Sequence, residues 1–352
     1  MFDNIYENKK VLITGHTGFK GSWLCAWLEK LGSDIMGYAL SPPTNPNHYE
    51  LLNLNVRSTI DNICDYKNLL ETFNEFKPEI VFHLAAQSSV LVSYNKTRET
   101  INTNVLGTLN VLEASRNTKS VRAVVIVTTD KCYENKEWVY PYRENDRLGG
   151  HDLYSASKAS AELITASFRK SFCISKRDLN RPLIVTAMAV NVIGGGDWTN
   201  DRLVPDVFKA VKKSKIVEIR NPESIRPWQH VMDSLSGYLL LGQKLLEQKT
   251  EFSDSWNFGP NTDSFISTLS LINMMKNHWD IISAQKSFKE SNLHESKYLM
   301  LDSKKAEIRM DWNPVWDIEN SVIKTVQWYK TFLEDGKIIT ANQINSYISD
   351  AV

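Results

Sequence analysis

The first half of the chain alternates apolar runs with segments of helical pattern. Three runs, at residues 80–84, 121–127 and 183–190, are apolar without interruption, which is typical of strands covered on both faces of a sheet. Residues 11–14 and 34–38 are two further predicted strands, and residues 22–31, 65–76, 99–118 and 154–172 are predicted helices. Strands that alternate with helices in this way favour a parallel sheet. The sequence therefore predicts a doubly wound α/β fold.

The pattern changes after residue 190. Prolines at 205, 222, 227, 260 and 314 separate shorter elements, and tryptophans recur between 198 and 328. We expect residues 1–190 to form the parallel-sheet domain, with a returning segment near 233–258, and residues 191–352 to form a smaller, irregular α/β lobe. Because open α/β sheets bind ligands at the carboxyl ends of their strands, this lobe is expected to close over that edge and bind the substrate.

Composition excludes several classes of partner. The 41 basic and 41 acidic residues balance, so no global charge attracts nucleic acid or an anionic membrane. The four cysteines, Cys25, Cys64, Cys132 and Cys173, lack the spacing of a metal site, so we expect no metal and a reducing compartment. No apolar signal segment precedes the first predicted strand, and no apolar run reaches the length of a membrane span. We therefore expect a soluble cytoplasmic protein.

A glycine-rich turn follows the first predicted strand and opens the first predicted helix. Gly15, Gly18 and Gly21 have the spacing G-x-x-G-x-x-G. Glycines at such a turn let backbone N–H groups approach a pyrophosphate at the positive end of a helix. A turn of purely structural purpose is the alternative, which the position at the first strand–helix junction disfavours. The turn therefore predicts a Rossmann-type domain that binds a dinucleotide.

The end of the second predicted strand bears on the choice of dinucleotide. Residues 37–41 contain no acid for a ribose 2′-hydroxyl and no arginine for a 2′-phosphate, and the missing arginine favours NAD. Asp65, at a later strand–helix junction, is a candidate for accepting a hydrogen bond from the adenine. It is equally well explained as the N-terminal cap of the helix that it precedes, and the sequence leaves the two open.

Tyr154 and Lys158 lie four residues apart at the start of a predicted helix and therefore share one face. A phenol with a pKa of about 10 is a poor base at neutral pH. A neighbouring ammonium stabilises the phenolate and lowers this pKa, so we predict that Tyr154 takes a proton from a sugar hydroxyl. An exposed, unreactive pair is the alternative, since Tyr6 and Lys10 show the same spacing in a polar segment.

Thr128, Thr129, Asp130 and Lys131 follow the apolar strand at 121–127. A threonine hydroxyl at this strand end is in position to reach the substrate. Redox chemistry needs only the tyrosine and the lysine of the later helix, so the acid and amine at 130 and 131 indicate a second reaction that moves a proton and a leaving group. An Asp-Lys pair in a loop is usually solvated surface. Its place at the carboxyl end of a sheet strand is what favours the site.

Several motifs together resemble the extended short-chain dehydrogenase/reductase family of nucleotide-sugar enzymes. They are Thr14-Gly15-x-x-Gly18-Phe19-x-Gly21, His83-Leu84-Ala85-Ala86-Gln87, Asn104-Val105-x-Gly107-Thr108 and Tyr154-x-x-x-Lys158. The resemblance implies tightly held NAD and a homodimer formed through two helices of the cofactor domain. It implies that the cofactor is bound by Gly15, Thr17, Gly18, Phe19, Lys20, Gly21, Asp65, Leu84, Ala86, Asn104, Thr128, Tyr154 and Lys158.

Further motifs are similar to those of the branch of this family that removes water from CDP-glucose. They are Gly18-Phe19-Lys20-Gly21-Ser22-Trp23-Leu24, Tyr38-Ala39-Leu40-x-Pro42-Pro43-Thr44, Thr129-Asp130-Lys131-Cys132-Tyr133, Leu148-Gly149-Gly150-His151-Asp152, Gly194-Gly195-Gly196-Asp197-Trp198 and Arg226-Pro227-Trp228-Gln229-His230-Val231. This second resemblance implies a CDP-glucose substrate and the product CDP-4-keto-6-deoxyglucose.

The resemblance also implies roles for the reacting residues. Tyr154, as a phenolate, removes the C4 hydroxyl proton while a hydride passes from C4 to NAD, and the hydride later returns to C6. Lys131 stands where dehydratases of dTDP-glucose have a glutamate, which implies that it removes the C5 proton as a neutral amine. Asp130 would then protonate the departing C6 hydroxyl.

The nucleotide sugar is expected to be bound by Gln87, Asn191, Arg202 and Arg226. Arg226 is suited to pair with a diphosphate, and a structural ion pair is its alternative. Residues 188 and 190 are methionine and valine, where the resemblance implies arginine and glycine, so the approach to the pocket is bulkier and less polar.

Two other functions are compatible with parts of this pattern. An epimerase, or a dehydratase of another nucleotide sugar, would share the glycine turn and the pair at 154 and 158. An epimerase, however, leaves Asp130 and Lys131 without a role. A regulatory protein that senses the dinucleotide would keep the glycine turn but would not need Tyr154 with Lys158.

Overall fold

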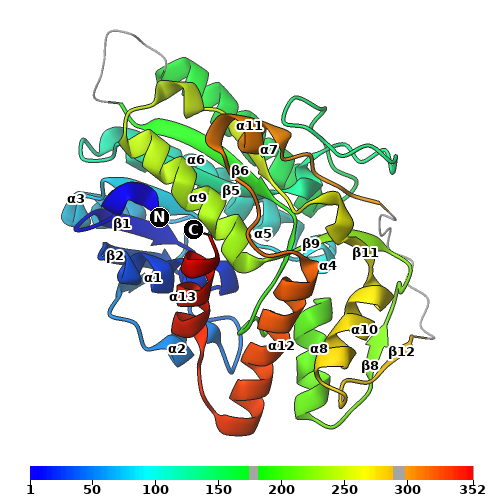
Figure 1. Ribbon diagram of the computed structural model, residues 1–352. Helices are drawn as coiled ribbons and strands as arrows, with labels where there is room; N and C mark the ends of the chain where they lie inside the picture. Colours follow the sequence, from blue (N-terminus) through cyan, green and yellow to red (C-terminus); the bar gives the residue numbers. More distant parts are fainter. Residues whose placement is uncertain (174–180, 288–297, 352) are drawn as a thin grey trace.

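Seven parallel strands form the main sheet, in the order β10-β6-β5-β4-β1-β2-β3 (Figure 1). The structure is a computed structural model that describes residues 1–173, 181–287 and 298–351. The strands of this sheet are β1 (Lys10–Thr14), β2 (Asp34–Ala39), β3 (Arg57–Ile60), β4 (Ile80–His83), β5 (Ala123–Thr129), β6 (Leu183–Ala189) and β10 (Ser255–Phe258). The Rossmann-type fold class predicted from the sequence is confirmed.

Helices connect these strands and continue to the C-terminus. They are α1 (Phe19–Lys30), α2 (His48–Leu52), α3 (Tyr66–Phe76), α4 (Val90–Asn95), α5 (Thr97–Ile101), α6 (Gly107–Asn117), α7 (Leu153–Phe172), α8 (Leu203–Lys212), α9 (Val231–Leu246), α10 (Thr268–His278), α11 (Lys304–Met310), α12 (Ile318–Asp335) and α13 (Thr340–Asp350). Among the helices of the described ranges, none combines the length and the apolar character that crossing a membrane requires.

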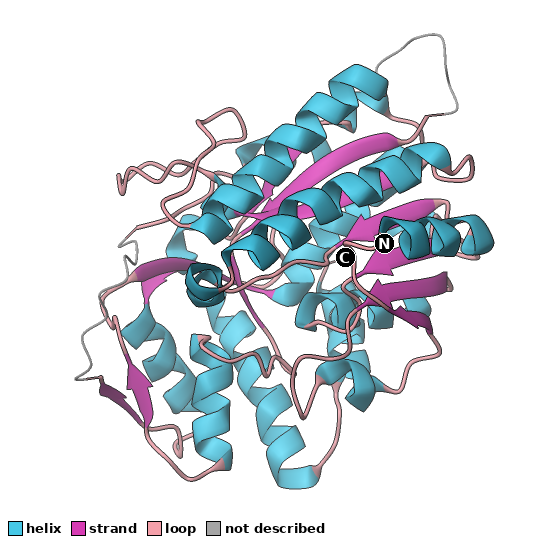
Figure 2. Cartoon of the chain, turned by 180° about the vertical axis from the view of Figure 1, so that it is seen from behind, coloured by secondary structure: helices cyan, strands magenta, loops and turns pink. Residues whose placement is uncertain are grey.

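Helices cover both faces of the main sheet (Figure 2). Along β1, Val11 and Ile13 pack in one core cluster with residues of α1 and α9, whereas Leu12 packs in a second cluster with residues of α3, α6 and α7. Because successive side chains of a strand point to opposite faces, a strand buried on both sides needs apolar residues at every position. This requirement explains the unbroken apolar runs of the sequence.

The predicted strands at 11–14, 34–38, 80–84, 121–127 and 183–190 correspond to β1, β2, β4, β5 and β6. The sequence did not reveal β3, because this edge strand is largely exposed and lacks an apolar run. The helical stretch predicted at about 99–118 is confirmed, because residues 97–117 are helical throughout, although part of this stretch is a π-helix. The segment consists of α5, a π-helix (η2, Asn102–Leu106) and α6, and the buried Asn104 side chain in η2 bonds to neighbouring segments.

The second half of the chain forms two small sheets and returns once to the large one. The small sheets are β11 (Phe265–Ser267), β9 (Ile225–His230) and β7 (Asn191–Ile193), and β12 (Ala284–Lys286) with β8 (Val217–Ile219). In the sequence between β9 and β11, helix α9 packs on β5 and β6, and strand β10 pairs in parallel with β6. The returning segment expected near 233–258 thus lies against the main sheet, while the division of the chain near residue 190 stays a prediction.

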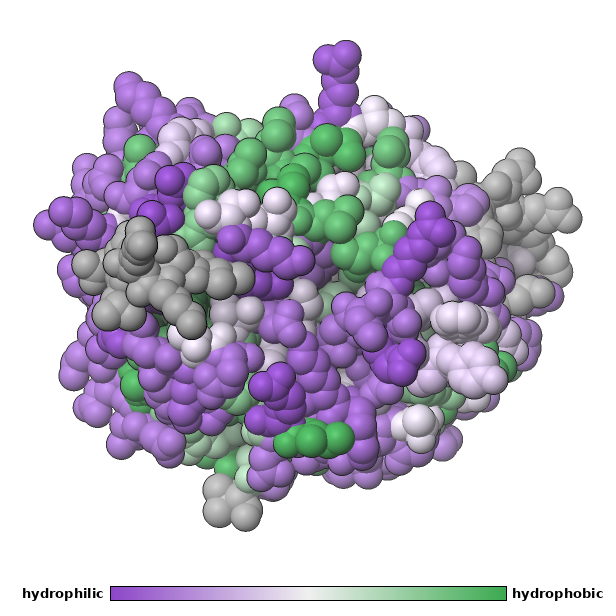
Figure 3. Space-filling view, turned by 90° about the horizontal axis from the view of Figure 1, so that it is seen from above, coloured by the Kyte–Doolittle hydropathy of each residue, from purple (hydrophilic) through white to green (hydrophobic). Residues whose placement is uncertain are grey.

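Seen from above, hydrophobic side chains gather in one area of a surface that is hydrophilic over most of its extent (Figure 3). Large apolar side chains that are exposed include Leu163 on α7, at 58 %, and Leu106 just before α6, at 48 %. Both positions belong to the helical segments that cover one face of the main sheet.

A buried carboxyl connects α9 to the C-terminal helix. Asp233 Oδ1, in the first turn of α9, accepts hydrogen bonds from the Val315 N–H at 2.7 Å and from the Tyr347 hydroxyl of α13 at 2.8 Å. Helix α13 also contacts α1, and the two ends of the chain lie side by side (Figures 1 and 2). Burial raises the pKa of Asp233 to about 7.

We predict that Asp233→Asn removes a pH dependence of stability. The folded pKa lies above the usual value of about 3.9. The folded state therefore holds a proton that the unfolded state has lost, and the wild type loses stability as pH rises from about 4 to 7. Between pH 5.5 and 7.5 the wild type should lose on the order of 2 kcal/mol of its free energy of unfolding through this group, and the variant should not. Urea unfolding of both proteins at the two pH values measures this difference. Asp350→Asn, at an exposed carboxylate of α13, is the control; equal pH dependence in wild type and Asp233→Asn would contradict the prediction.

Candidate active site

A cavity of about 1230 Å³ opens at the carboxyl ends of the central strands. Its wall includes Gly15 after β1, Asp61 after β3, Leu84 after β4, Thr129 at the end of β5 and Ala189 at the end of β6. Pockets for one drug-sized ligand are typically about 300–1,000 Å³, so this cavity has room for a dinucleotide and a second ligand. The described parts of the chain contain no cluster of His, Cys, Asp and Glu that could hold a metal ion.

The glycine-rich turn forms one end of the cavity. Gly15 has a φ of +75°, and a Cβ there would lie 2.6 Å from the Ala85 nitrogen. A Cβ on Gly21 would lie 2.2 Å from the Gly15 carbonyl oxygen, so α1 begins directly against the turn. Among the described residues, the same carbonyl oxygen is the one atom within 4 Å of a Cβ placed on Gly18, at 3.4 Å. Protein contacts thus account for two of the glycines, and the third leaves space for a ligand.

The start of α1 is suited to an anion. Gly18 is its N-cap and provides no side-chain hydrogen bond, so the first N–H groups of this twelve-residue helix are left for a ligand at its positive end. The Thr17 hydroxyl donates to the Leu40 carbonyl at 2.9 Å, which ties the turn to the end of β2. Eleven of the predicted cofactor residues line the cavity: Gly15, Thr17, Gly18, Phe19, Lys20, Gly21, Leu84, Ala86, Thr128, Tyr154 and Lys158. This set fits a dinucleotide.

Asp65 is the N-terminal cap of α3, where its Oδ1 accepts from the Asn68 N–H at 3.1 Å, and it does not line the cavity. Asp61, four residues earlier, does line it. Its carboxylate accepts from the Asn62 N–H at 2.6 Å and from Asn68 Nδ2 at 2.7 Å, and these bonds lower its pKa. The sequence analysis missed Asp61 because it missed β3; the signal was an acid placed directly after that strand.

Asn104 and Gln87 brace a loop behind the cavity wall. The Gln87 N–H donates to Asn104 Oδ1 at 2.9 Å, and Asn104 Nδ2 donates to the Gln87 carbonyl at 3.0 Å and to Ser157 Oγ at 2.8 Å. Neither residue lines the cavity, whereas Ser88 does. Contact of Asn104 and Gln87 with a ligand stays a prediction, and their amides are engaged in holding the loop.

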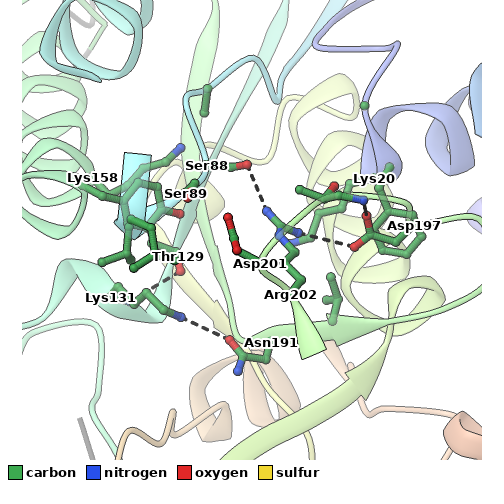
Figure 4. A pocket seen from close by; sticks show the side chains of 18 of the residues that line it. Lys20, Ser88, Ser89, Thr129, Lys131, Lys158, Asn191, Asp197, Asp201 and Arg202 are labelled. Carbon is green, nitrogen blue, oxygen red and sulfur yellow. Dashed lines mark hydrogen bonds and ion pairs between the residues drawn. The ribbon is translucent and has the colours of Figure 1, made fainter. Parts of the chain in front are cut away.

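Lys131 faces the cavity and Asp130 lies behind it. Lys131 Nζ donates to Asp130 Oδ1 at 3.0 Å. It also donates to Asn191 Oδ1 at 3.1 Å (Figure 4). Asp130 is fully buried, and its Oδ1 also accepts from the Thr129 hydroxyl at 2.7 Å. A 3-10 turn over Asp130–Cys132 directly follows β5 and gives the two side chains these different environments. Thr129 and Lys131 therefore connect a buried carboxylate to the cavity.

Tyr154 and Lys158 line the same cavity from the first turns of α7, and Asp152 caps this helix by accepting from the Ser155 N–H at 2.9 Å. Burial raises the pKa of Tyr154 to about 12, and the charge that opposes this rise most is Arg202 rather than Lys158. The sequence analysis expected the Lys158 ammonium to lower the pKa of Tyr154, but in this structure burial outweighs the neighbouring positive charge and the pKa is raised. Burial also lowers the pKa of Lys158, to about 8.

Three of the predicted substrate residues come from the second half of the chain and line the cavity. Arg202, the N-cap of α8, donates from Nη2 to Ser88 Oγ at 2.9 Å, and its Nη1 lies 3.6 Å from Asp197 Oδ2 (Figure 4). Arg226 is a buried residue of β9, and Asn191 opens β7. Ser88 and Asp197 were missed, because contacts between segments so distant in sequence leave no local pattern.

A sequence family described as GDP-mannose 4,6 dehydratase matches residues 12–325 of the chain. The chain belongs to this family. The match contains the glycine turn, the residues at 129–131 and the start of α7, so the described cavity is the candidate active site of a family member.

Relatives within the dehydratases differ widely in similarity. The chain is 42 % identical over 351 residues to a CDP-glucose 4,6-dehydratase of Salmonella typhimurium, covering 98 % of each protein. It is 25 % identical over 356 residues to a dTDP-glucose 4,6-dehydratase of the same organism, covering 91 % of this chain and 92 % of the relative.

Solved structures share the fold. A UDP-glucose 4-epimerase of Thermotoga maritima with UDP-glucose superposes with a TM-score of 0.79 at 22 % identity, covering 92 % of this chain and 99 % of the other. A dTDP-glucose 4,6-dehydratase of Bacillus anthracis in complex with NAD gives a TM-score of 0.74 at 21 % identity, covering 93 % and 98 %. At these identities the likeness concerns the fold alone.

Lys20, a half-buried residue in the first turn of α1, places an amine in the cavity of this family member. Its Nζ donates to the Tyr238 hydroxyl at 3.2 Å, and it forms no ion pair with a carboxylate of the described residues. Burial, followed by the neighbouring Arg202 charge, lowers its pKa to about 7, and the Asp130 charge opposes this shift. An anion bound beside this amine would favour its protonated form.

We predict that a diphosphate ligand takes up a proton at Lys20. At pH 8, binding of ADP should be accompanied by uptake of roughly one proton, because the anion raises the pKa of the amine above the solution pH. Calorimetric titration in two buffers with different heats of ionisation measures this number. Lys20→Arg keeps a cation that does not titrate and should bind ADP with less than about half of the uptake. Equal uptake in wild type and Lys20→Arg would contradict the prediction.

Proposed function

We propose that this chain removes water from CDP-D-glucose to give CDP-4-keto-6-deoxy-D-glucose, with NAD as a cofactor that is regenerated in each cycle. The observation that carries the proposal is the 42 % identity with a CDP-glucose 4,6-dehydratase over 98 % of both proteins, against 25 % for a dehydratase of dTDP-glucose. The Asp130–Lys131 pair beside the cavity supports an elimination rather than an epimerisation, which has no use for it.

The residues of the cavity fit NAD. The open space above Gly18 and the uncapped start of α1 suit its diphosphate, and Asp61 is placed to accept from the adenine. The cavity wall at the end of β2 consists of Ala39, Leu40, Ser41 and Pro43, without a cation for a 2′-phosphate. When bound, NAD would accept the hydride from C4, return it to C6 and place a positive charge beside the phenol.

Tyr154 is the proposed base for the C4 hydroxyl. Its phenol is buried in the cavity wall with Thr129 and Lys158. Because burial holds its pKa at about 12, positive charge in the loaded site is needed to make the phenol reactive. Lys158 supplies one such charge from the next turn of α7. Oxidation at C4 then gives a ketone, which makes the neighbouring C5 proton acidic.

Lys131 and Asp130 are the proposed base and acid of the elimination. Moving one proton from Lys131 Nζ to Asp130 Oδ1, across 3.0 Å, converts the ion pair into a neutral amine and a carboxylic acid. The amine takes the C5 proton, the C5–C6 double bond forms, and the C6–O bond breaks as the hydroxyl receives the proton of Asp130. Thr129, which is hydrogen-bonded to Asp130 and lines the cavity, connects the buried acid to the substrate. The protonated amine returns a proton to C5 as C6 is reduced. The pair has then lost one proton, to the departing water, and Tyr154 has gained one, from the C4 hydroxyl, so transfer of one proton from Tyr154 to the pair by way of the solvent restores the starting state.

Arg202, Arg226 and Asn191 are the proposed contacts of the nucleotide sugar. Two guanidinium groups in the wall offer paired donors to a diphosphate. Asn191 holds the Lys131 amine at 3.1 Å, so a sugar bound between the strand ends and this lobe would lie against the acid–amine pair.

We also infer a homodimer formed through helices of the cofactor domain. The inference rests on the family resemblance and is supported by the exposed apolar side chains of Leu163 on α7 and Leu106 before α6. Large contiguous apolar patches on a protein surface often mark contacts with a partner.

The purified protein should release water from CDP-glucose and not, at comparable rates, from dTDP-, UDP- or GDP-glucose. We expect at least about a 100-fold preference in kcat/KM, because a site built to bind one base leaves polar groups unpaired with another. Mass spectrometry of the products measures the water loss. Isomerisation without a change in mass would indicate an epimerase, and no turnover with any sugar nucleotide would leave a dinucleotide sensor; either result would refute the proposal.

Asp130→Asn should slow water loss far more than the initial oxidation at C4. General acid catalysis contributes about 100- to 10,000-fold, so water loss should fall at least 100-fold, while oxidation should change by less than about tenfold. Single-turnover experiments that follow NADH absorbance and product mass separate the two steps. Equal loss in both steps would remove Asp130 from the acid role. Tyr154→Phe is the complementary variant, in which oxidation itself should be abolished.

A further inference from the structure

Glu162 lies below the reacting residues on the buried face of α7. Tyr154, Lys158 and Glu162 follow one another at intervals of four residues, so their side chains form a line along one side of the helix. All three are buried, but the first two line the cavity and Glu162 does not. A carboxylate at this depth has no access to the substrate.

The end of β5 holds the side chains of both Lys158 and Glu162. The Thr128 hydroxyl donates to Glu162 Oε1, and Lys158 Nζ donates to the Val127 carbonyl at 3.2 Å. The two strand residues are adjacent, so the lysine and the glutamate are fixed against the same short segment. Thr128 itself lines the cavity, which makes it a link between Glu162 and the wall of the site.

Three influences set the pKa of the Lys158 amine: its burial, Glu162 and Cys132. Burial lowers the pKa of its amine to about 8, and Glu162 is the largest influence in the opposite direction, followed by the Cys132 thiol. Burial raises the pKa of Glu162, and its neighbours Thr128, Thr186, Arg169 and Lys158, in decreasing order of influence, lower it. Lys20 and His83 in turn are influenced by the Lys158 charge. Glu162 is thus the main described counter-charge of the lysine.

We propose that Glu162 is a positioning residue of this active site, whose buried carboxylate keeps the Lys158 ammonium charged one helical turn from Tyr154. The proposal rests on the proposed function, since a charged Lys158 is what the tyrosine base requires. Glu162 acts through Lys158 and does not touch substrate or cofactor.

A purely structural purpose does not explain the negative charge. The hydrogen bond from Thr128 needs an acceptor oxygen, and a glutamine would provide one at lower cost. Burying a carboxylate is expensive unless cations nearby compensate. The charge is therefore understandable where a buried cation must be stabilised. Two cations lie near Glu162. Arg169 has a further carboxylate in Asp254, at 3.7 Å from its Nη2, whereas for Lys158 Glu162 is the largest opposing charge.

The charge on Lys158 can be read directly without substrate. Competitive labelling with acetic anhydride over a range of pH, followed by peptide mass spectrometry, gives the titration of each lysine that the reagent reaches. In Glu162→Gln, which keeps the oxygen for Thr128, we expect the Lys158 midpoint to fall from about 8 to about 7 or lower. Glu113→Gln removes an exposed carboxylate of α6 and should leave the midpoint unchanged.

Glu162→Asp separates charge from shape and serves as the second variant if Glu162→Gln does not fold. It keeps the negative charge on a shorter side chain, so its Lys158 midpoint should stay near that of wild type. A midpoint unchanged in Glu162→Gln, or lowered equally in Glu162→Asp and Glu162→Gln, would overturn the proposal.

Activity provides the matching readout. Because the ammonium form of Lys158 is required, kcat/KM for water loss should decline as pH rises through the lysine midpoint, and this decline should begin at lower pH in Glu162→Gln. If the Lys158 midpoint is shifted in Glu162→Gln but the pH profile of kcat/KM is the same as in wild type, Glu162 has no role in the reaction. The labelling experiment needs no substrate, so it tests the effect of Glu162 on Lys158 even if the protein does not act on CDP-glucose. Failure of the proposed function and failure of this proposal can therefore be told apart.

Discussion

The contact between the Lys131 ammonium and the Asp130 carboxylate is the interaction on which the proposed chemistry depends. The two residues are neighbours in sequence, yet one is buried and the other faces a cavity. In a continuing strand, neighbouring side chains would point to opposite faces of the sheet. The 3-10 turn that begins at Asp130 replaces that alternation and lets the amine fold back onto the carboxylate. A buried carboxylate needs such partners to be tolerated, so the bonds that hold the proton also stabilise this strand end.

The parallel sheet explains how distant segments meet at this contact. Strand ends near residues 14, 83, 129 and 189 lie along one edge, and the second half of the chain covers that edge with Asn191, Arg202 and Arg226. This half is also joined to the sheet, since α9 packs on it and β10 extends it beside β6. The Asp233 bonds then attach the C-terminal helix to α9. The site is therefore a product of the whole chain rather than of the dinucleotide domain alone.

The sequence predicted those features whose physical cause is local. Apolar runs revealed the central strands because burial on both faces demands apolar residues at every position, and Gly15 and Gly21 revealed the turn because no other residue fits the space there. The edge strand β3 gave no such signal, and Asp61 was missed with it. Gln87 and Asn104 were recognised as special, but sequence could not show that they bond to each other instead of lining the cavity. Contacts such as Arg202 with Ser88 depend on the folded arrangement of segments and have no counterpart in the sequence pattern.

Two amines of the cavity, those of Lys20 and Lys158, differ in the charged groups that surround them. Lys20 has Arg202, Lys131 and Lys158 as neighbours, and burial with these cations lowers its pKa to about 7. Lys158 lies one helical turn from Glu162, and its pKa is less depressed, at about 8. In the proposed mechanism, the protein itself thus provides the counter-charge for the amine that the tyrosine base needs at all times. At the start of α1, where a diphosphate is expected, the ligand can supply that negative charge, so the Lys20 amine can be left close to neutral until the ligand arrives.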